Sequence, residues 1–164
     1  MSELEGRVPP GLFEAVVRKF ASAAIVVTAV GDSGPVAVRI SSFSHVSFDP
    51  PLVLVCISRS LGSHMAFVRA QSWGVSALSA VQATDERLFG ANAEIAGPEL
   101  STIEGAATGV PLLVGATAYL ECIAFDRHPA GDSVILVGEV AAAGHSDVPP
   151  LLHFDGRYVG LRPL

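Results

Sequence analysis

A proline corner between two strand-like runs is the feature of this chain that most constrains its fold. Residues 49–51, D-P-P, separate a hydroxyl-rich run, R-I-S-S-F-S-H-V-S, from an apolar run, L-V-L-V-C-I. Successive prolines fix φ and restrict the residue before them, so the chain must leave the first strand before it enters the second. The corner therefore predicts two separate strands of unlike character.

Strand-like runs also dominate the rest of the chain, and residues 31–34, G-D-S-G, predict a hairpin turn between the first two. The first run covers residues 24–30, the second begins at Pro35, and the others lie at residues 52–58, 74–78, 117–126, 133–143 and 157–161. Roughly seven strands against three helices favour a mainly β fold, an antiparallel barrel or sandwich, over regular βαβ alternation.

Three segments have helical spacing. Residues 11–22 form an amphipathic pattern that we expect to close over a core, and residues 63–71 form a second. Residues 79–90 form the third, with Ser79 and Gln82 in capping-box spacing. Residues 91–116 have weak periodicity and are expected to be a long surface excursion.

Composition limits the class of protein. A chain of 164 residues that is 50% hydrophobic supports one domain, residues 1–164. No apolar run approaches the roughly 20 residues that span a bilayer, and the N-terminus lacks a signal pattern, so neither a membrane protein nor secretion is expected. The net charge is −6 and the basic residues are scattered, which argues against nucleic-acid binding. Only 16% of the residues are charged, which predicts surface buried in a homodimer.

The cysteines and histidines give no sign of a metal site. Cys56 and Cys122 each lie in an apolar run, where a free thiol acts as a small hydrophobe, and free thiols fit the reducing cytoplasm. The histidines lack metal-ligand spacing, and no nucleophile elbow or Cys/His pair is evident. We therefore expect no metal and no catalytic side chain, and any reaction would take its reactive atom from a cofactor.

The polar run before the corner has hydroxyls on both sides. Strand alternation places Arg39, Ser41, Phe43, His45 and Ser47 on one face. An edge or interface strand would explain this pattern without a ligand. Alternatively, the Ser hydroxyls and strand amides meet the polar edge of a bound ring system.

The loop after the apolar strand, S-R-S-L-G-S-H, is rich in anion-binding groups. Hydroxyls of Ser58, Ser60 and Ser63, the charge of Arg59 and the amides at a helix start together suit a phosphate. A plain capped loop needs only one of these serines and remains the alternative. A flat ring beside a phosphate indicates a nucleotide cofactor, most simply a flavin.

Four motifs in order extend this interpretation. The stretch S-S-F-S-H-V-S-F-D-P-P-L-V-L-V-C-I resembles the S-A-F-x-S-V-S-x-x-P-P-L-V-L-V-C signature of the flavin reductase-like, split-barrel flavin-binding family. F-A-S-A-A-I-V-V-T, G-D-S-V-I-L-V-G-E-V and P-P-L-L-H-F-D-G-R-Y are similar to three further family motifs. The resemblance covers about residues 12–161.

The resemblance implies a homodimer of six-stranded antiparallel Greek-key barrels that bind FMN or FAD and accept a hydride from NADH or NADPH. Reduced flavin is commonly passed to a partner flavin-dependent monooxygenase. The implied flavin-binding residues are Arg39, Ser41, Ser42, Asp49, Pro50, Pro51, Ser58, Arg59, Ser60, Ser63 and Ser76. The implied nicotinamide-binding residues are Gly131, Asp132, Ser133 and Tyr158.

Three of these residues depart from the family pattern. Arg39 replaces a small residue or Thr, and it could pair with phosphate or ring oxygens or fill space that the flavin usually takes. Ser76 replaces an Asn, and Ser133 replaces a His that would contact nicotinamide. Two other functions stay open: a diverged split-barrel protein that keeps a flavin for another redox partner or purpose, and a non-catalytic dimeric interaction module.

Overall fold

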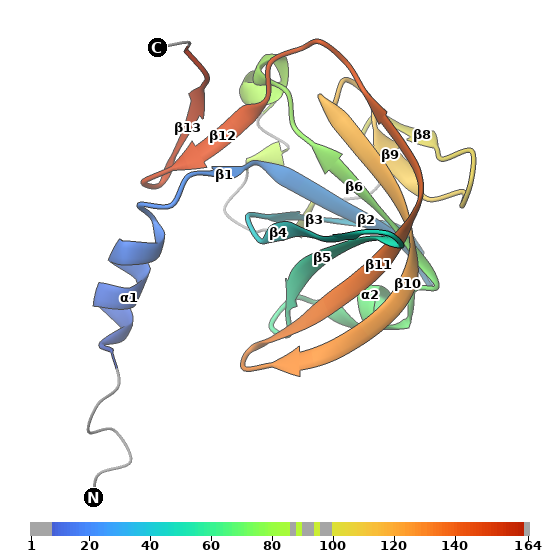
Figure 1. The fold of residues 1–164 in the computed structure, drawn as a ribbon, viewed down its shortest axis with the longest axis horizontal. Coiled ribbons are helices and arrows are strands. Elements are labelled where there is room, and N and C mark those ends of the chain that lie inside the picture. The colour runs from blue at the N-terminus through green and yellow to red at the C-terminus, as the bar shows by residue number, and fades with distance from the viewer. Residues whose placement is uncertain (1–7, 86–87, 90–93, 96–99, 163–164) are drawn as a thin grey trace, which may run out of the picture.

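The fold is built on antiparallel strands in the computed structural model, which describes residues 8–85, 88–89, 94–95 and 100–162. The main sheet contains β2 Ile25–Gly31, β3 Gly34–Ile40, β4 Phe43–Phe48, β5 Pro51–Ser58, β6 Ser72–Ala77, β7 Glu94–Ile95, β10 Ala118–Ala130 and β11 Ser133–His145. Their order is β4-β5-β11-β10-β6-β2-β3-β7, and every pair is antiparallel (Figure 1). The predicted mainly β, antiparallel fold is confirmed.

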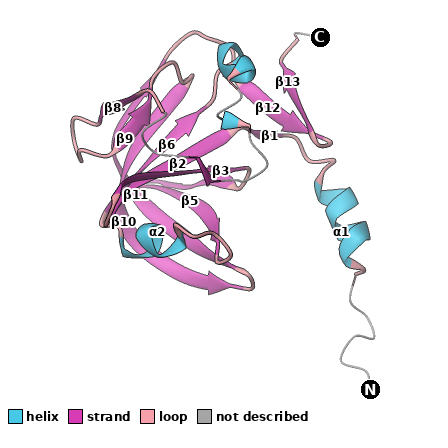
Figure 2. Ribbon diagram, turned by 180° about the vertical axis from the view of Figure 1, so that it is seen from behind, coloured by secondary structure: helices cyan, strands magenta, loops and turns pink. Residues whose placement is uncertain are grey.

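The remaining elements lie beside this sheet. Two smaller sheets contain β1 Ser22–Ala23, β12 Leu151–Phe154 and β13 Arg157–Gly160, and β8 Thr102–Glu104 and β9 Pro111–Leu113. The helices in the described residues include α1 Pro10–Val17, α2 His64–Arg69 and the 3-10 helix Ala80–Thr84. None of the helices in the described part of the chain is long and apolar enough to cross a bilayer. Figure 2 shows how little of the molecule is helical.

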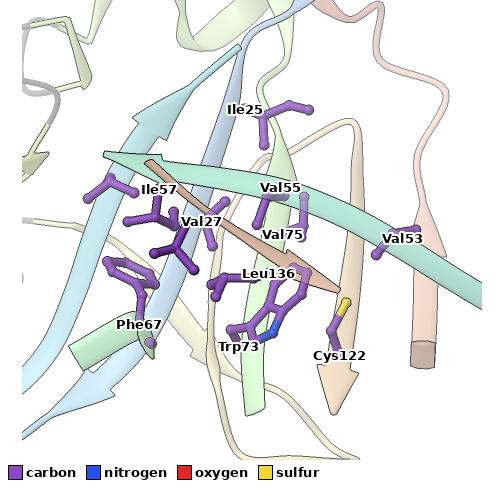
Figure 3. Close-up of a cluster of buried hydrophobic side chains, with 13 residues drawn as sticks. Ile25, Val27, Val53, Val55, Ile57, Phe67, Trp73, Val75, Cys122 and Leu136 are labelled. Carbon is purple, nitrogen blue, oxygen red and sulfur yellow. The ribbon is translucent and has the colours of Figure 1, made fainter. Parts of the chain in front are cut away.

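Six strands of the main sheet curl around one hydrophobic core. β2, β3, β5, β6, β10 and β11 all contribute buried side chains to it, and Phe67 of α2 closes one end. Figure 3 shows the core side chains gathered between the strands, with the ring of Trp73 beside Leu136. β3 and β5 contact each other without being paired in the sheet, so the barrel is split between them.

The sequence of β2 is apolar without alternation because both faces of the strand are buried. Ile25 and Val27 face the barrel core, whereas Val26 belongs to a second buried cluster on the outer face of the same strand. Leu113 of β9 belongs to that second cluster. The expectation that residues 91–116 form only a surface excursion is therefore wrong, because buried β9 covers the outside of the barrel; residues 91–93 and 96–99 lie outside the described residues.

The proline corner separates β4 from β5 as predicted, but the polar run before it is not one strand. β3 pairs with β2 as far as Ile40, and β4 begins its pairing with β5 at Phe43. Ser41 and Ser42 lie between them, where the chain passes from one edge of the split to the other. The predicted alternation from Arg39 to Ser47 is wrong because of this break.

Two helices differ from expectation. α1 forms, but no residue in it is buried and it projects from the barrel (Figure 1), so it does not close over the core of its own chain. Its terminal contacts tether it to the β12–β13 turn: Lys19 forms an ion pair with Asp155 at 2.8 Å. The predicted continuous helix 79–90 is wrong: the 3-10 helix Ala80–Thr84 ends at Asp85, which adopts an extended conformation. The Ser79–Gln82 capping box is present. Residues 86–87 and 90 lie outside the described residues.

Candidate cofactor site

Ser42 bridges the split in the barrel. Its hydroxyl accepts a hydrogen bond from the backbone N–H of Cys56 at 3.1 Å and lies 3.3 Å from the Cys56 carbonyl, to which it donates. The side chain thus satisfies β5 backbone groups where no β3 partner reaches them. This contact fixes the Ser41–Ser42 break beside the end of β5.

A cavity of about 930 Å³ opens at this break. Its volume lies within the roughly 300–1,000 Å³ of small-molecule and cofactor sites. The predicted cofactor-binding residues that line it are Arg39, Ser41, Ser42, Ser58, Asp132, Ser133 and Tyr158. The structure therefore brings the predicted flavin and nicotinamide residues together around one space.

The pairing of β5 with β11 brings the predicted flavin residues and the predicted nicotinamide residues together. Ser133 at the start of β11 lies directly opposite Ser58 at the end of β5. The backbone N–H of Arg59 donates to the Asp132 carbonyl at 2.9 Å, and the Ser133 hydroxyl donates to the Asp132 carboxylate at 2.9 Å. The loop after β5 and the β10–β11 turn are thereby held as one polar rim.

An aromatic wall stands on another side of the cavity. Tyr158 of β13 pairs across the strands with His153 of β12, and the ring of Phe89 meets Tyr158 edge-on at a centroid distance of 4.4 Å. The Arg39 guanidinium lies 5.8 Å from the centroid of the Phe89 ring. Its Nη1 donates to the Leu88 carbonyl at 2.6 Å. Arg39 therefore anchors this wall, a role that neither sequence-based alternative included.

Several predicted site residues do not line this cavity. Ser76 is buried inside the fold, and its hydroxyl accepts a hydrogen bond from the Leu113 N–H at 3.1 Å. Residues 49–51 lie at the opposite end of β5 from Ser58. Ser63 lines a separate cavity of about 490 Å³. Arg59, Ser60 and Gly131 lie in loops next to lining residues without lining the cavity themselves.

The structure adds lining residues that sequence reasoning missed. They are Phe13, Val17, Ala24, Ile40, Cys56, Leu61, Ala130, Ile135 and His153. The alternation of β5 and β11 would indicate that Cys56 and Ile135 point away from the barrel core. Nothing local in the sequence indicates that α1 or His153 reaches this space.

The two thiols are both free, and the buried one is not suited to chemistry. Burial in the barrel core, with a smaller contribution from the neighbouring Glu121 carboxylate, raises the pKa of the Cys122 thiol to about 12. A thiol with this pKa stays protonated at neutral pH and is a poor nucleophile. Within residues 8–85, 88–89, 94–95 and 100–162, no three His, Cys, Asp or Glu side chains gather to hold a metal ion.

The split barrel has a cavity between serine-bearing backbone and a polar turn, which is an arrangement suited to binding a cofactor. The chain belongs to the flavin reductase like domain family, whose model matches residues 17–162. The resemblance noted in the sequence is confirmed, and so is the expected enzyme class, a flavin oxidoreductase.

Relatives and solved structures agree with this assignment. The chain is 37% identical to the FMN reductase (NADH) SmoA of Agrobacterium fabrum, over 89% of this chain and 83% of that protein. It is 34% identical to an NADH-dependent FAD reductase of Streptomyces globisporus, over 73% and 68%. The crystal structure of BorF, the flavin reductase component of a bacterial two-component tryptophan halogenase, matches with a TM-score of 0.84 at 34% identity, covering 95% of this chain and all (100%) of that one.

Proposed function

We propose that this protein reduces FMN or FAD with NADH or NADPH and passes the reduced flavin to a flavin-dependent monooxygenase. The observation that carries the proposal is the single cavity lined by both Ser41 and Ser42 and the Asp132–Ser133 turn. Relatives support the electron donor and the acceptor, since they are named as NADH-dependent reductases of FMN and of FAD. A Mycobacterium tuberculosis relative, 30% identical, is named as the reductase subunit of a flavin-dependent monooxygenase.

The residues present fit a flavin. Backbone and hydroxyl groups at Ser41 and Ser42 would meet the polar edge of the ring, while Ser58, Arg59 and Ser60 would face the phosphate from the adjoining loop. The hydroxyls of Ser58 and Ser60 already lie 2.9 Å apart, so they converge on one point at the rim. A role in flavin binding stays a prediction for Ser63, Ser76 and residues 49–51, and it has no support from the cavity because none of these residues lines it.

When both cofactors are bound, they would supply the chemistry, which is the transfer of a hydride from C4 of the nicotinamide to N5 of the flavin. The chain contributes position, because Asp132 and Ser133 would seat the nicotinamide beside a ring held at Ser41 and Ser42. Tyr158 and the apolar residues of the cavity would exclude water from the stacked rings. No acid or base is required at this step, which agrees with the proposed absence of a catalytic side chain.

Steady-state kinetics test the proposal. The purified protein should accelerate the oxidation of NADH or NADPH only when FMN or FAD is present, because the flavin is the electron acceptor. Loss of the absorbance band of the reduced nicotinamide reports the rate for each pair of flavin and nucleotide. Flavin binding without any oxidation of either nucleotide would favour the alternative, a split-barrel protein that keeps its flavin for another purpose.

We also propose that residues 1–164 form one domain that assembles as a homodimer in the cytoplasm. Apolar side chains are exposed on α1 and β4: Phe13 is 62% exposed, and Phe48 is 86% exposed. Contiguous exposed apolar surface usually marks a contact with another chain. Light scattering at micromolar concentration should give twice the mass of the chain, and a monomer mass would contradict the dimer. The two free thiols support a reducing compartment.

Arg39 lines the cavity, so we expect its guanidinium to donate to a phosphate or ring oxygen of the flavin. Replacing Arg39 with alanine should then weaken flavin binding by about 1.5–3 kcal/mol, the contribution of a hydrogen bond from a charged group. It should also loosen the wall at Leu88 and Phe89, which the guanidinium holds in place. Fluorescence titration with FMN and FAD measures the change. Arg69→Ala, on α2 and away from this cavity, is the matched control. Unchanged affinity in the Arg39 variant would leave Arg39 with no role in flavin binding.

A further inference from the structure

The hydroxyl of Ser42 takes the place of a backbone partner in the β4–β5 ladder. The pairing of these strands ends with Phe43 opposite Val55. One residue further along, Ser42 would lie opposite Cys56, and a hydrogen-bonded antiparallel pair exchanges two backbone N–H···O=C bonds. Here the Ser42 hydroxyl accepts from the Cys56 N–H at 3.1 Å and donates to the Cys56 carbonyl at 3.3 Å. A side chain therefore makes both of the contacts that a backbone partner would make.

This contact uses the hydrogen of the Ser42 hydroxyl. A serine hydroxyl has a single hydrogen to donate, and the Cys56 carbonyl accepts it. The polar edge of a flavin ring presents mainly acceptors, which are carbonyl oxygens and ring nitrogens, so it needs donors from the protein. The Ser42 hydroxyl cannot donate to a flavin while it holds β5.

Other polar groups at the break are left for a ligand. Ser42 lies outside the strands, and no backbone–backbone hydrogen bond of Ser42 occurs in the described part of the chain. The exposed Ser41 hydroxyl likewise has no hydrogen-bond partner among the residues that the structure describes. Ser41, Ser42 and Cys56 all line the cofactor cavity. The free donors and acceptors of the break thus lie on the wall of that cavity.

We infer that Ser42 is a positioning residue for the flavin. Its hydroxyl fastens the break to β5, so that the Ser42 backbone and the Ser41 hydroxyl remain free for the polar edge of the ring. The inference rests on the proposed flavin-binding function, and it changes the role of the Ser42 side chain from contact with the flavin to support of the site. The family signature has alanine at this position, so the Ser42 hydroxyl is a feature of this chain and not of the signature.

Four variants separate support from direct contact. Ser42→Ala removes the hydroxyl that holds β5, whereas Ser42→Thr keeps a hydroxyl at the same position. Ser41→Ala removes the hydroxyl that we expect to meet the ring and leaves the contact with Cys56 in place. Ser44→Ala, on β4 outside the cavity, is the matched control, because the Ser44 hydroxyl donates to the neighbouring His45 carbonyl.

Amide hydrogen exchange in the flavin-free protein, followed residue by residue by NMR, tests the contact itself. A hydrogen-bonded amide exchanges only when its bond opens, so the rate at Cys56 reports the bond to Ser42. We expect the Cys56 amide to exchange about tenfold faster in S42A than in wild type, as the loss of one hydrogen bond would allow. The rate in S42T, S41A and S44A should stay close to that of wild type.

Fluorescence titration with riboflavin, FMN and FAD tests the consequence for binding. S42A should bind all three about three- to tenfold more weakly, because they share the ring whose contacts lose their support. S42T and S44A should match wild type, and S41A should bind more weakly without faster exchange at Cys56. Wild-type affinity in S42A, or weaker binding with unchanged exchange at Cys56, would overturn the positioning role. Failure of the wild-type protein to bind any flavin would contradict the proposed function and this role with it, and unchanged exchange in S42A would show separately that the contact is absent.

Discussion

Gly138→Ala is expected to lower the free energy of unfolding by about 3 kcal/mol, at the upper end of the cost of overpacking a core. Gly138 lies in β11 directly over the ring of Trp73. A Cβ there would lie 2.5 Å from Trp73 Cζ2 and 2.8 Å from the Cβ of Cys122. Cys122 is held by its strand and Trp73 by the barrel core, so neither can move aside cheaply.

Urea denaturation followed by Trp73 fluorescence measures this loss, since Trp73 is the only tryptophan in the sequence. Gly160→Ala is the matched control, because no heavy atom lies within 4 Å of its added Cβ. β11 also carries Ser133 and Ile135 to the cavity, so Gly138→Ala should weaken flavin binding as well. Wild-type stability in Gly138→Ala would contradict the described packing of the barrel.

Glu121→Ala is expected to cost about 2–3 kcal/mol of stability at neutral pH, the scale of hydrogen bonds to a charged group. Glu121 is buried in β10 and anchors the loop before β9. Its Oε2 accepts hydrogen bonds from the Thr108 N–H at 2.7 Å, the Thr108 hydroxyl at 2.8 Å and the Ala107 N–H at 3.1 Å. Removing the carboxylate leaves these donors without their partner. Thermal or urea denaturation measures the loss, and Glu104→Gln controls for the charge.

The pH dependence of stability gives a second test of Glu121. Burial alone would raise the pKa of its carboxyl, but hydrogen bonds from Thr108 and Ala107 outweigh burial and hold the pKa below its ordinary value. A lowered folded-state pKa contributes stability above the unfolded-state pKa of about 4.3, and this contribution is lost as the pH falls further. The stability difference between wild type and Glu121→Gln should therefore shrink on acidification from pH 7 to below about 4. A difference that stays constant over this range would contradict the described hydrogen bonds.

Much of the fold follows from local sequence signals. Residues 49–51 require a break between two strands, and residues 31–34 form the predicted turn, with Gly34 at a φ of 114°. The break at Ser41 and Ser42 has no such signal, since Ser is compatible with strand geometry. It arises because β3 and β4 pair with different strands, which is a property of the whole sheet. The spacing of apolar residues in α1 predicts a helix with one apolar face, but it does not say whether that face packs on the barrel of the same chain. In the structure it does not.

The candidate site likewise contains residues that local sequence signals predict and residues that they do not. Ser58 was predicted from the polar loop that follows an apolar run, which is a local signal, whereas Ser41 and Ser42 reach the cavity at a break that only the whole sheet creates. Ser133 reaches it by register with β5, which only the motif resemblance indicated. Ser76 was predicted from a motif position, but its hydroxyl is used by Leu113.

The central claim is that one cavity holds both rings, with the flavin at the break between β3 and β4 and the nicotinamide at the β10–β11 turn. A crystal structure of the protein with FMN or FAD and NAD tests it most directly. We predict density for the isoalloxazine ring beside Ser41 and Ser42, with the nicotinamide stacked on it near Asp132 and Ser133. Density for either ring in the separate cavity that Ser63 lines would contradict the claim. So would a cofactor cavity that is filled by the side chains of Arg39 and Tyr158.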